Sequence, residues 1–270
     1  MRSMAKAKLS YSILVAFVIV RMCLCSNTMA QEKQLPAELK PFIPAGYEML
    51  DFVTGHLDND NSNDAILILK VTGEDSITDS EPKRPLLLLT RNKEGKLHIA
   101  KRNDNAVMCR QCGGVFGDPY EKTEINNYGF SISFYGGSSW RWGYDYQFIY
   151  DAPKNDWMLT REKQISYHNT EPELNIQETV IEADEIGIIP FSDFNISREH
   201  AEKKWKVTCK KANFYNSPKL GSKARKAYLI KDDEVTGTRT LKNFIQVEFK
   251  NSKDEYTYGF IPRTCLQPLD

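Results

Sequence analysis

The sequence contains few histidines, and it has no long hydrophobic run after its first 30 residues. None of the four histidines lies in a Gly-x-Ser-x-Gly or His-Glu-x-x-His setting, so the chain lacks the common hydrolase signatures. Later segments fall short of the roughly 20 apolar residues that a membrane-spanning helix needs. No repeat of fixed period and no helical stripe is present, which excludes solenoids, repeat-built propellers and coiled coils. Nucleic-acid recognition motifs are also missing.

The first 30 residues contain no acidic side chain. They begin with Arg2, Lys6 and Lys8 and continue into an apolar run at positions 11–20. They end on Thr28-Met29-Ala30, which places small residues at the two positions that a signal peptidase reads. This layout predicts a secretory signal peptide over residues 1–30. We therefore expect a periplasmic or secreted protein without a membrane span.

Charge is unevenly distributed along the rest of the chain. Residues 31–202 hold 17 basic and 29 acidic side chains, whereas residues 203–270 hold 15 basic and 7 acidic ones. Such asymmetry indicates two units that bind different partners or attract each other. Chance variation among solvated surfaces is the simpler explanation, and it stays open.

Short alternating or apolar runs fill residues 46–170. The runs at 65–69 and 86–90 are nearly all apolar, as in fully buried strands, while those at 130–134 and 144–150 alternate. Residues 92–96 predict a hairpin turn. Period-two runs at this spacing predict an antiparallel β domain over residues 46–170. The polar residues 31–45, which include three prolines, predict an extended arm before it.

The remainder of the chain divides into a connector and a second β unit. Residues 171–204 are acid-rich and weakly patterned, which indicates a connector that ends in a short helix over 197–204. Residues 205–270 contain four runs typical of strands, at 206–209, 227–230, 244–249 and 256–261. Several short strands in so short a segment predict a small barrel. The predicted fold is therefore mainly β, with an antiparallel β domain followed by a small β-barrel.

Four cysteines remain after the signal peptide: Cys109, Cys112, Cys209 and Cys265. An even number in an exported chain predicts disulfides. A bond between Cys209 and Cys265 would stabilise the fold by about 4 kcal/mol, and one between Cys109 and Cys112 by only about 2 kcal/mol. For the second pair, a disulfide that braces a turn is favoured over a redox pair, because no helix signal follows it. It is also favoured over a zinc site, because no second close pair exists.

The C-terminal unit resembles the bacterial SH3-like domain family. The residues that carry the resemblance are 212–218 (ANFYNSP), 226–235 (KAYLIKDDEV), 244–247 (FIQV), 258–261 (YGFI) and 266 (L). The family usually has glycine at position 232 and tryptophan at position 260. The resemblance implies a small barrel over 205–269 that binds cell-wall material or peptides. A shallow aromatic groove would be formed by Phe214, Tyr215, Tyr228 and Phe260, and the net positive charge would favour an anionic wall polymer. The alternative is that these aromatic residues form the barrel core.

Residues 55–64 (GHLDNDNSND) are similar to the acidic calcium loops of integrin-type propeller repeats. The matching positions are Asp58, Asp60 and Asp64, and the carbonyl of Ser62 adds a further oxygen. Calcium binds roughly six to eight oxygen ligands, so the resemblance implies a Ca²⁺ site at these carboxylates. His56 stands where the family has its first acid. The alternative is a β-turn in which Asn and Asp side chains cap their own backbone, with no cofactor.

Residues 103–142 resemble an exported bacterial family of unknown function. The shared pattern is CxxCGG…GDP…YGGSxWRW, which begins at Cys109 and ends at Trp142. The resemblance names no activity. Strand alternation places Trp140 and Trp142 on one face, and with Arg141 and Tyr144 they form a candidate aromatic and cationic binding surface. Burial of both tryptophans in the core is the alternative.

These observations predict a non-catalytic binding protein of the cell envelope, with peptidoglycan or an envelope protein as its partner. Two alternatives stay open. One is a divergent cell-envelope hydrolase in which Cys109 or Cys112 acts with His168, because catalytic partners need to meet only in space. The other is a structural or inhibitory module whose acidic N-terminal domain docks a basic protein.

Overall fold

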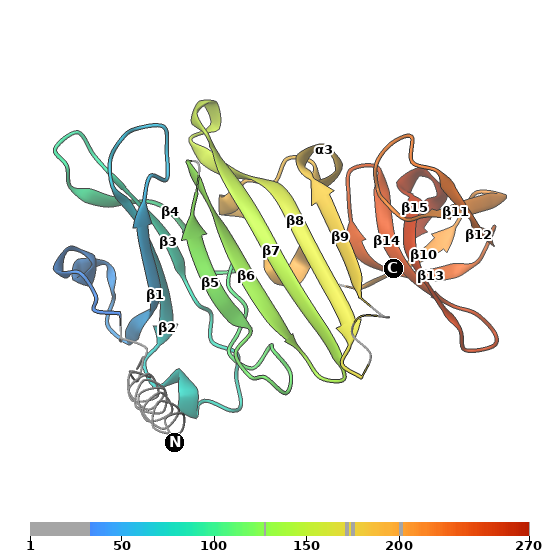
Figure 1. The fold of residues 1–270 in the computed structure, drawn as a ribbon, viewed down its shortest axis with the longest axis horizontal. Coiled ribbons are helices and arrows are strands. Elements are labelled where there is room, and N and C mark those ends of the chain that lie inside the picture. Colours follow the sequence, from blue (N-terminus) through green and yellow to red (C-terminus); the bar gives the residue numbers. More distant parts are fainter. Residues whose placement is uncertain (1–32, 127, 171–172, 174–175, 200–201, 270) are drawn as a thin grey trace, which may run out of the picture. The chain divides into compact units, whose positions relative to one another are not determined.

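The computed structural model describes residues 33–126, 128–170, 173, 176–199 and 202–269. The predicted signal peptide lies outside these residues. All described strands belong to one unit, Ala37–Asp270, and Figure 1 shows their arrangement. Within the described residues, no helix combines the length and the hydrophobicity that crossing a membrane requires.

Two antiparallel sheets form the N-terminal part of this unit (Figure 1). Sheet A has the strand order β1-β2-β3-β4, and sheet B has the order β5-β6-β7-β8-β9. Sheet A consists of β1 (Tyr47–Gly55), β2 (Asp64–Val71), β3 (Leu86–Arg91) and β4 (Leu97–Asn103). Sheet B consists of β5 (Tyr120–Ile125), β6 (Gly129–Gly137), β7 (Trp140–Asp151), β8 (Asp156–His168) and β9 (Gln177–Glu182).

The C-terminal part is a third antiparallel sheet, sheet C, which curls into a half-barrel. Its strand order is β12-β11-β15-β14-β13-β10-β16. The strands are β10 (Lys203–Val207), β11 (Lys211–Tyr215), β12 (Ala224–Ile230), β13 (Glu234–Thr240), β14 (Phe244–Lys250), β15 (Tyr256–Pro262) and β16 (Leu266–Pro268). The prediction of a mainly β, antiparallel fold is confirmed. In the turn before β13, Asp232 has a φ of 76°, a conformation that glycine adopts without strain.

The buried runs were predicted as strands, and the structure confirms them. Residues 65–69 of β2 and 86–89 of β3 are buried on both faces. The predicted hairpin turn at 92–96 joins β3 to β4, with the Asn92 N–H donating to the Lys96 carbonyl at 3.0 Å. Sheets A and B share one hydrophobic core. Across it, Trp157 of β8 donates its indole N–H to the Leu57 carbonyl at 2.8 Å.

The helical elements are short, and two expectations need correction. The segment 31–45 is not simply extended, because it contains the 3-10 helix η1 (Ala37–Phe42), whose Leu39 is buried. The helix expected over 197–204 is only α4 (Ile196–Glu199), because Lys203 already pairs with Gly237 in sheet C. Positions 200 and 201 lie outside the described residues. The other helical elements are η2 (Glu74–Ser76), η3 (Ala152–Lys154), α3 (Ala183–Ile186), η4 (Phe191–Asp193) and η5 (Arg263–Cys265).

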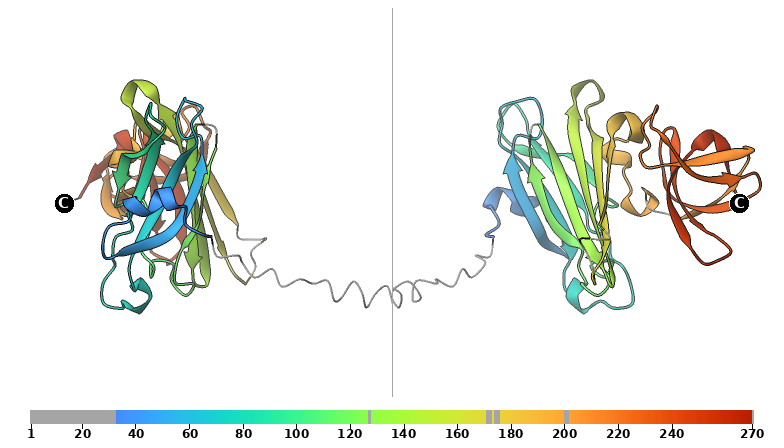
Figure 2. Two further views of the ribbon diagram at one scale, coloured as in Figure 1. Left: turned by 90° about the vertical axis from the view of Figure 1, so that its left-hand side faces the viewer. Right: turned by 45° about the vertical axis from the view of Figure 1, so that its right-hand side comes forward.

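Much of the segment expected to be a connector is part of the fold. β9 pairs with β8 and completes sheet B. The chain then passes behind sheet B, as the two turned views in Figure 2 also show. There Phe191 and Phe194 are buried, and the Asn103 carboxamide donates to their two carbonyls at 2.5 and 2.8 Å. These contacts hold the segment that links sheet B to sheet C in the sequence against Asn103 of β4.

Both predicted disulfides are present: Cys109 bonds to Cys112, and Cys209 bonds to Cys265. The second one joins the chain after β10 to η5, directly before β16. It therefore ties together two segments that are 56 residues apart in the sequence and that flank the neighbouring strands β10 and β16.

Sheet C packs firmly against sheet B. Arg239 of β13 forms an ion pair with Glu162 of β8, with an Nη2–Oε2 distance of 2.8 Å, and their side chains are only 3% and 0% exposed. Leu241, Phe244 and Phe260 of the C-terminal part belong to the same hydrophobic cluster as the core of sheets A and B. A buried, hydrogen-bonded ion pair requires fixed geometry. This contact therefore holds sheets B and C in a fixed position relative to each other.

Candidate ligand-binding groove

One face of sheet B carries rows of aromatic and amide side chains. Strand alternation puts Trp140, Trp142 and Tyr144 of β7 on this face. In the neighbouring strands, Tyr144 lies beside Gln164 of β8, and Gln164 lies beside Thr179 of β9. The next row runs from Trp142 through Ser166 to Gln177. These rows form one wall of a groove.

Sheet C supplies the opposite wall. Thr238 of β13, Gln246 of β14 and Tyr258 of β15 line the same cavity as Trp140 and Trp142. We call this cavity the aromatic groove. Its volume is about 350 Å³, within the range of small-molecule sites in proteins. The complete lining is Trp140, Trp142, Tyr144, Gln164, Ile165, Ser166, Gln177, Thr179, Thr238, Gln246 and Tyr258.

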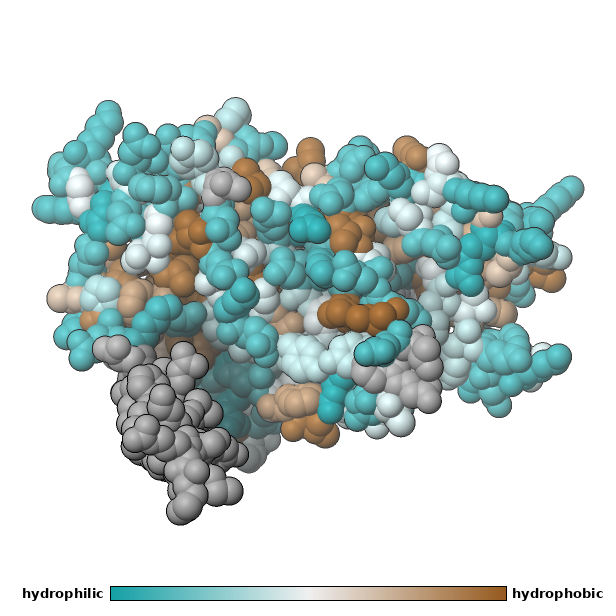
Figure 3. Space-filling model, viewed as in Figure 1, coloured by the Kyte–Doolittle hydropathy of each residue, from teal (hydrophilic) through white to brown (hydrophobic). Residues whose placement is uncertain are grey.

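The aromatic residues at the mouth of the groove are accessible. Trp140 is 54% exposed and Tyr258 is 49% exposed. Deeper in the groove, the rings of Trp142 and Tyr144 lie 5.3 Å apart with an interplanar angle of 34°. On the face shown in Figure 3, hydrophobic residues are scattered among hydrophilic ones. The groove thus offers aromatic surface that a ligand can reach.

A chain of hydrogen bonds holds the amide side chains of the groove. Glu162 accepts from Arg239 through Oε2 and from the Gln164 carboxamide through Oε1, the latter at 2.5 Å. Gln246 then donates to the Gln164 carboxamide oxygen across the two sheets at 3.3 Å. A glutamine carboxamide offers two donors and two acceptor lone pairs. The buried ion pair therefore orients a polar floor that keeps capacity for further hydrogen bonds.

Tyr144 lies in a poorly hydrated part of the groove. Burial, supported by the nearby charge of Glu162, raises the pKa of Tyr144 to about 12. Burial also raises the pKa of Tyr258, with further contributions from Glu248 and Tyr256. Both phenols are therefore neutral at physiological pH. No aspartate, glutamate, histidine, lysine or arginine is among the described residues that line the aromatic groove.

A second hollow continues from the groove along β9 and β15. It shares Gln177, Thr179, Gln246 and Tyr258 with the aromatic groove, and its volume is about 680 Å³. The rings of Tyr256 and Tyr258 stack there, with centroids 6.2 Å apart and an interplanar angle of 14°. Because the two hollows share lining residues, they suit an extended ligand better than a compact one.

The candidate residues of β7 divide between the two faces of sheet B. Trp140 and Trp142 both line the aromatic groove. Arg141 points to the other face, where its guanidinium lies 4.0 Å from the centre of the Phe116 ring. The three residues therefore do not form a single surface.

The four aromatic candidates of sheet C are dispersed. Phe214 is buried in the half-barrel core, and Tyr215 is half-buried against Phe244. Phe260 is also buried, although it borders the second hollow. Tyr228 is exposed on the edge strand β12, where the Lys211 ammonium lies 4.3 Å above its ring. No single groove unites these four side chains.

Sequence reasoning missed Gln164, Gln246 and Tyr258. The alternation of Tyr256 and Tyr258 in a predicted strand signals two aromatics on one face. The two glutamines give no comparable signal, because their meeting depends on the register of separate sheets. Only the structure brings them together.

The structure brings Asp58, Asp60 and Asp64 together, with carboxylate oxygens within 4.8 Å of one another. Burial raises the pKa of both Asp58 and Asp64, and the mutual repulsion of the carboxylates adds to it. Asp64 is fully buried and accepts the N–H groups of Leu57 and Arg91 at 3.1 and 3.0 Å. The Ser62 carbonyl contacts His56 Nδ1 at 2.7 Å. The three carboxylates fit the hard oxygen ligands that Ca²⁺ prefers, and the turn hydrogen bonds of Asp58 and Asp60 also fit a self-capped loop.

The residues of the hydrolase alternative have other neighbours. His168 packs edge-on against Trp140, with ring centroids 5.3 Å apart, and its Nδ1 lies 2.9 Å from the Thr170 hydroxyl oxygen. Cys109 and Cys112 are joined in a disulfide. A cysteine nucleophile acts as a thiolate, so this pair would need reduction before it could serve as one.

Comparison of the chain with protein-family models, with curated proteins and with solved structures finds no match.

Proposed function

We propose that this protein is an exported, non-catalytic binding protein of the cell envelope, and that its aromatic groove holds an uncharged stretch of the cell-wall glycan. The observation that carries this proposal is the lining of the groove, which combines accessible aromatic rings with amide and hydroxyl side chains and contains no ionised group. The glycan backbone of peptidoglycan is neutral where its lactyl groups are joined to peptides, so the charge of the ligand matches that of the groove.

The chemistry of a sugar chain suits such a lining. One face of a pyranose ring presents C–H groups, which pack on aromatic rings, while its edge presents hydroxyl and acetamido groups. Trp140 and Tyr258 supply exposed rings, and Gln164 and Gln246 supply amides that the buried ion pair orients. Sites of this kind combine apolar surface with a few well-placed polar groups that fix the orientation of the ligand. The second hollow, which Glu178 and Arg225 also line, gives further units of the glycan a place to continue.

The same lining favours binding over catalysis. Glycoside hydrolysis usually needs two carboxyl groups that flank the scissile bond. The nearest buried carboxylate described, Glu162, is held by Arg239 and Gln164. A basic surface of sheet C remains as a rival site for an anionic wall polymer, and Tyr228 with Lys211 is its most accessible aromatic group.

Co-sedimentation with purified cell-wall sacculi tests the proposal. The chain from residue 31 onward should pellet with sacculi, and Trp140→Ala should abolish or strongly reduce this. Tyr228→Ala is the matched control, because Tyr228 is an equally exposed aromatic outside the groove. Binding should persist in high salt, since the groove is uncharged and salt screens only charges. Loss of binding in Tyr228→Ala or in high salt, with Trp140→Ala unaffected, would instead assign the wall contact to the basic surface.

A further inference from the structure

The Cys109–Cys112 disulfide lies at the wall of a separate cavity that shares Trp142 and Tyr144 with the aromatic groove. This cavity has a volume of about 370 Å³. Cys112 is exposed and Cys109 is half-buried, so Cys112 is the more accessible residue of the pair. The lining includes the apolar side chains of Pro82, Val107, Met108 and Trp142 beside polar and charged ones. A side chain that carries an incoming thiol therefore has a surface on which to dock.

The loop that carries this disulfide is held in place by other contacts. Arg84 donates to the Met108 carbonyl at 3.3 Å and to the carboxylates of Glu74 and Asp118 at 2.6 to 3.1 Å. Arg110 pairs with Asp75 at 2.8 Å, and the Gln111 carboxamide donates to the Ile77 carbonyl at 2.8 Å.

Backbone contacts hold the far side of the same loop. The N–H of Gly113 donates to the Gly117 carbonyl at 2.8 Å, and the Gly137 N–H donates to the Gly113 carbonyl at 2.9 Å. A disulfide that closes so short a loop contributes only about 2 kcal/mol by chain entropy. The loop should therefore keep its place when the bond is reduced, which is what reversible exchange requires.

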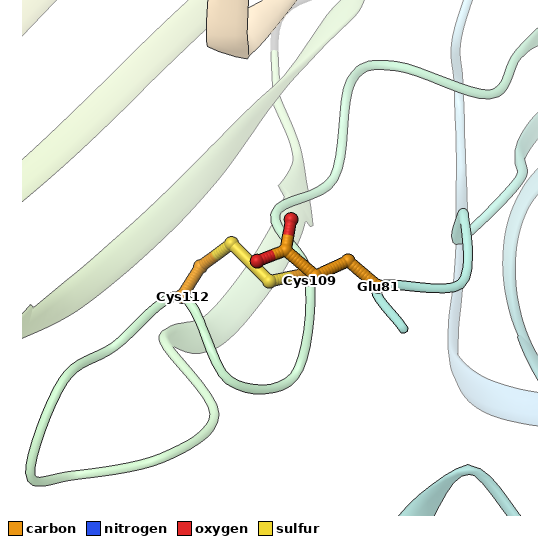
Figure 4. Close-up of side chains that lie close together, drawn as sticks. All are labelled: Glu81, Cys109 and Cys112. Carbon is orange, nitrogen blue, oxygen red and sulfur yellow. A yellow bond between two sulfur atoms is a disulfide. The ribbon is translucent and has the colours of Figure 1, made fainter. Parts of the chain in front are cut away.

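A third feature sets the charge at the sulfurs. Figure 4 shows the Glu81 side chain directed at the disulfide, and a carboxylate oxygen lies within 4.8 Å of both sulfur atoms. Arg110 pairs with Asp75, and Asp104 pairs with Arg102. Lys83 also lines the cavity and keeps its positive charge, because it donates to the neutral carboxamide of Asn105. The Glu81 carboxylate, which lies close to both sulfur atoms, repels an attacking thiolate. Free anionic thiols should be repelled, and thiols in neutral or basic surroundings should be preferred.

We propose that Cys109–Cys112 is a thiol–disulfide exchange centre whose partner is the dithiol of another protein, docked in this cavity through a neutral or basic segment. A partner thiolate attacks Cys112 Sγ, forms a mixed disulfide and displaces Cys109 as a thiolate, which takes a proton from solvent. The second partner thiol, once deprotonated, attacks the partner sulfur and releases Cys112. The partner dithiol is oxidised to a disulfide, the Cys109–Cys112 bond is reduced to two thiols, and the reverse sequence restores it.

The test uses Cys209–Cys265 of the same folded chain as an internal control. The chain from residue 31 is exposed to dithiothreitol under native conditions, quenched with an alkylating agent and mapped by peptide mass. We expect Cys109–Cys112 to be reduced at least 10-fold faster than Cys209–Cys265, with near-ultraviolet circular dichroism unchanged. Equal rates, or reduction of Cys109–Cys112 only together with loss of that signal, would overturn the proposal.

Two further measurements separate exchange from mere exposure. The Cys109→Ser variant, whose Cys112 is a free thiol, should attack cystamine faster than glutathione disulfide, which carries negative charge; each exchange forms a mixed disulfide and releases one reagent thiol. Glu81→Gln in the same background should reduce this preference several-fold, whereas Glu124→Gln, on an exposed ion pair of β5 outside the cavity, should leave it unchanged. A preference that Glu81→Gln does not alter would contradict the assigned charge selection. Failure of wall binding would leave these results unaffected, because the aromatic groove is tested separately.

Discussion

At the scale of single residues, the pair of Glu162 and Arg239 sets the geometry of the groove. Glu162 is the centre of a chain that runs from Arg239 through Gln164 to Gln246. Paired burial of two charges gives little net stability, but removal of one partner leaves the other charge buried without compensation. The pair thus fixes the position of sheet C relative to sheet B at this point.

Glu162→Ala should lower the free energy of unfolding by about 3–5 kcal/mol, because it removes the buried carboxylate that forms an ion pair with Arg239. Lys163→Ala is the control: Lys163 is the next residue along β8, and it pairs with Glu178 at the surface. Exposed pairs of this kind contribute about 1 kcal/mol or less. Urea denaturation of both variants measures the difference, and similar losses would refute the anchoring role of Glu162.

Tyr144 predicts a dependence of stability on alkaline pH. An unfolded tyrosine titrates near pH 10, while burial raises the pKa of Tyr144 to about 12 in the fold. The stability associated with its neutral form is complete below pH 10 and is lost as the pH rises toward 12. Urea denaturation at pH 9 and pH 11.5 should therefore show a smaller decrease for Tyr144→Phe than for the parent chain. Equal decreases would place Tyr144 in a hydrated site.

At the scale of elements, the loop between β1 and β2 joins three carboxylates. If it binds calcium as its sequence implies, Ca²⁺ at 100 times its dissociation constant should stabilise the fold by about 2.7 kcal/mol. Asp60→Asn should remove this gain, and Asp104→Asn, on a separate surface pair, should retain it. Thermal unfolding with Ca²⁺ and with a chelator measures both. An unchanged melting temperature in the parent chain would identify the loop as a self-capped turn.

The strands of sheets A and B were largely predictable, because their side chains alternate or are uniformly apolar. β9 was not, since the residues Gln177–Glu182 include four polar side chains and only Ile181 is buried. Only the side of the groove that sheet B forms could be predicted from the sequence. Alternation alone places Trp140 and Trp142 on one face of β7. Their opposing residues on sheet C are set by the docking of the half-barrel, which depends on contacts between residues distant in sequence.

The role of a glycine near the groove could not be predicted from the sequence either. A Cβ at Gly136 would lie 2.5 Å from the Trp142 ring and 2.9 Å from the Gly113 backbone. The sequence pattern contains this glycine without stating why it is needed. The structure gives the reason, which is the close approach of the cysteine loop to β6 beside Trp142.

At the scale of the whole molecule, the acidic and basic halves of the sequence meet in one packed unit within Ala37–Asp270. The contact combines the Glu162–Arg239 pair with a shared hydrophobic cluster. The charge asymmetry has three explanations: different partners, mutual attraction or chance. The Glu162–Arg239 pair is one attractive contact between the acidic and the basic part of the chain. The walls of the aromatic groove come from sheets B and C. The groove therefore exists only while these two sheets stay packed against each other.

The central claim is that the aromatic groove binds a neutral glycan. Isothermal titration of the chain from residue 31 with soluble glycan strands whose lactyl carboxyl groups are amidated, and therefore neutral, tests it most directly. We predict binding that is insensitive to salt, and that Trp140→Ala weakens it by about 2 kcal/mol, or roughly 30-fold. Tyr228→Ala should bind as the parent chain does. Absence of heat with glycan strands, or equal affinity in Trp140→Ala, would contradict the account.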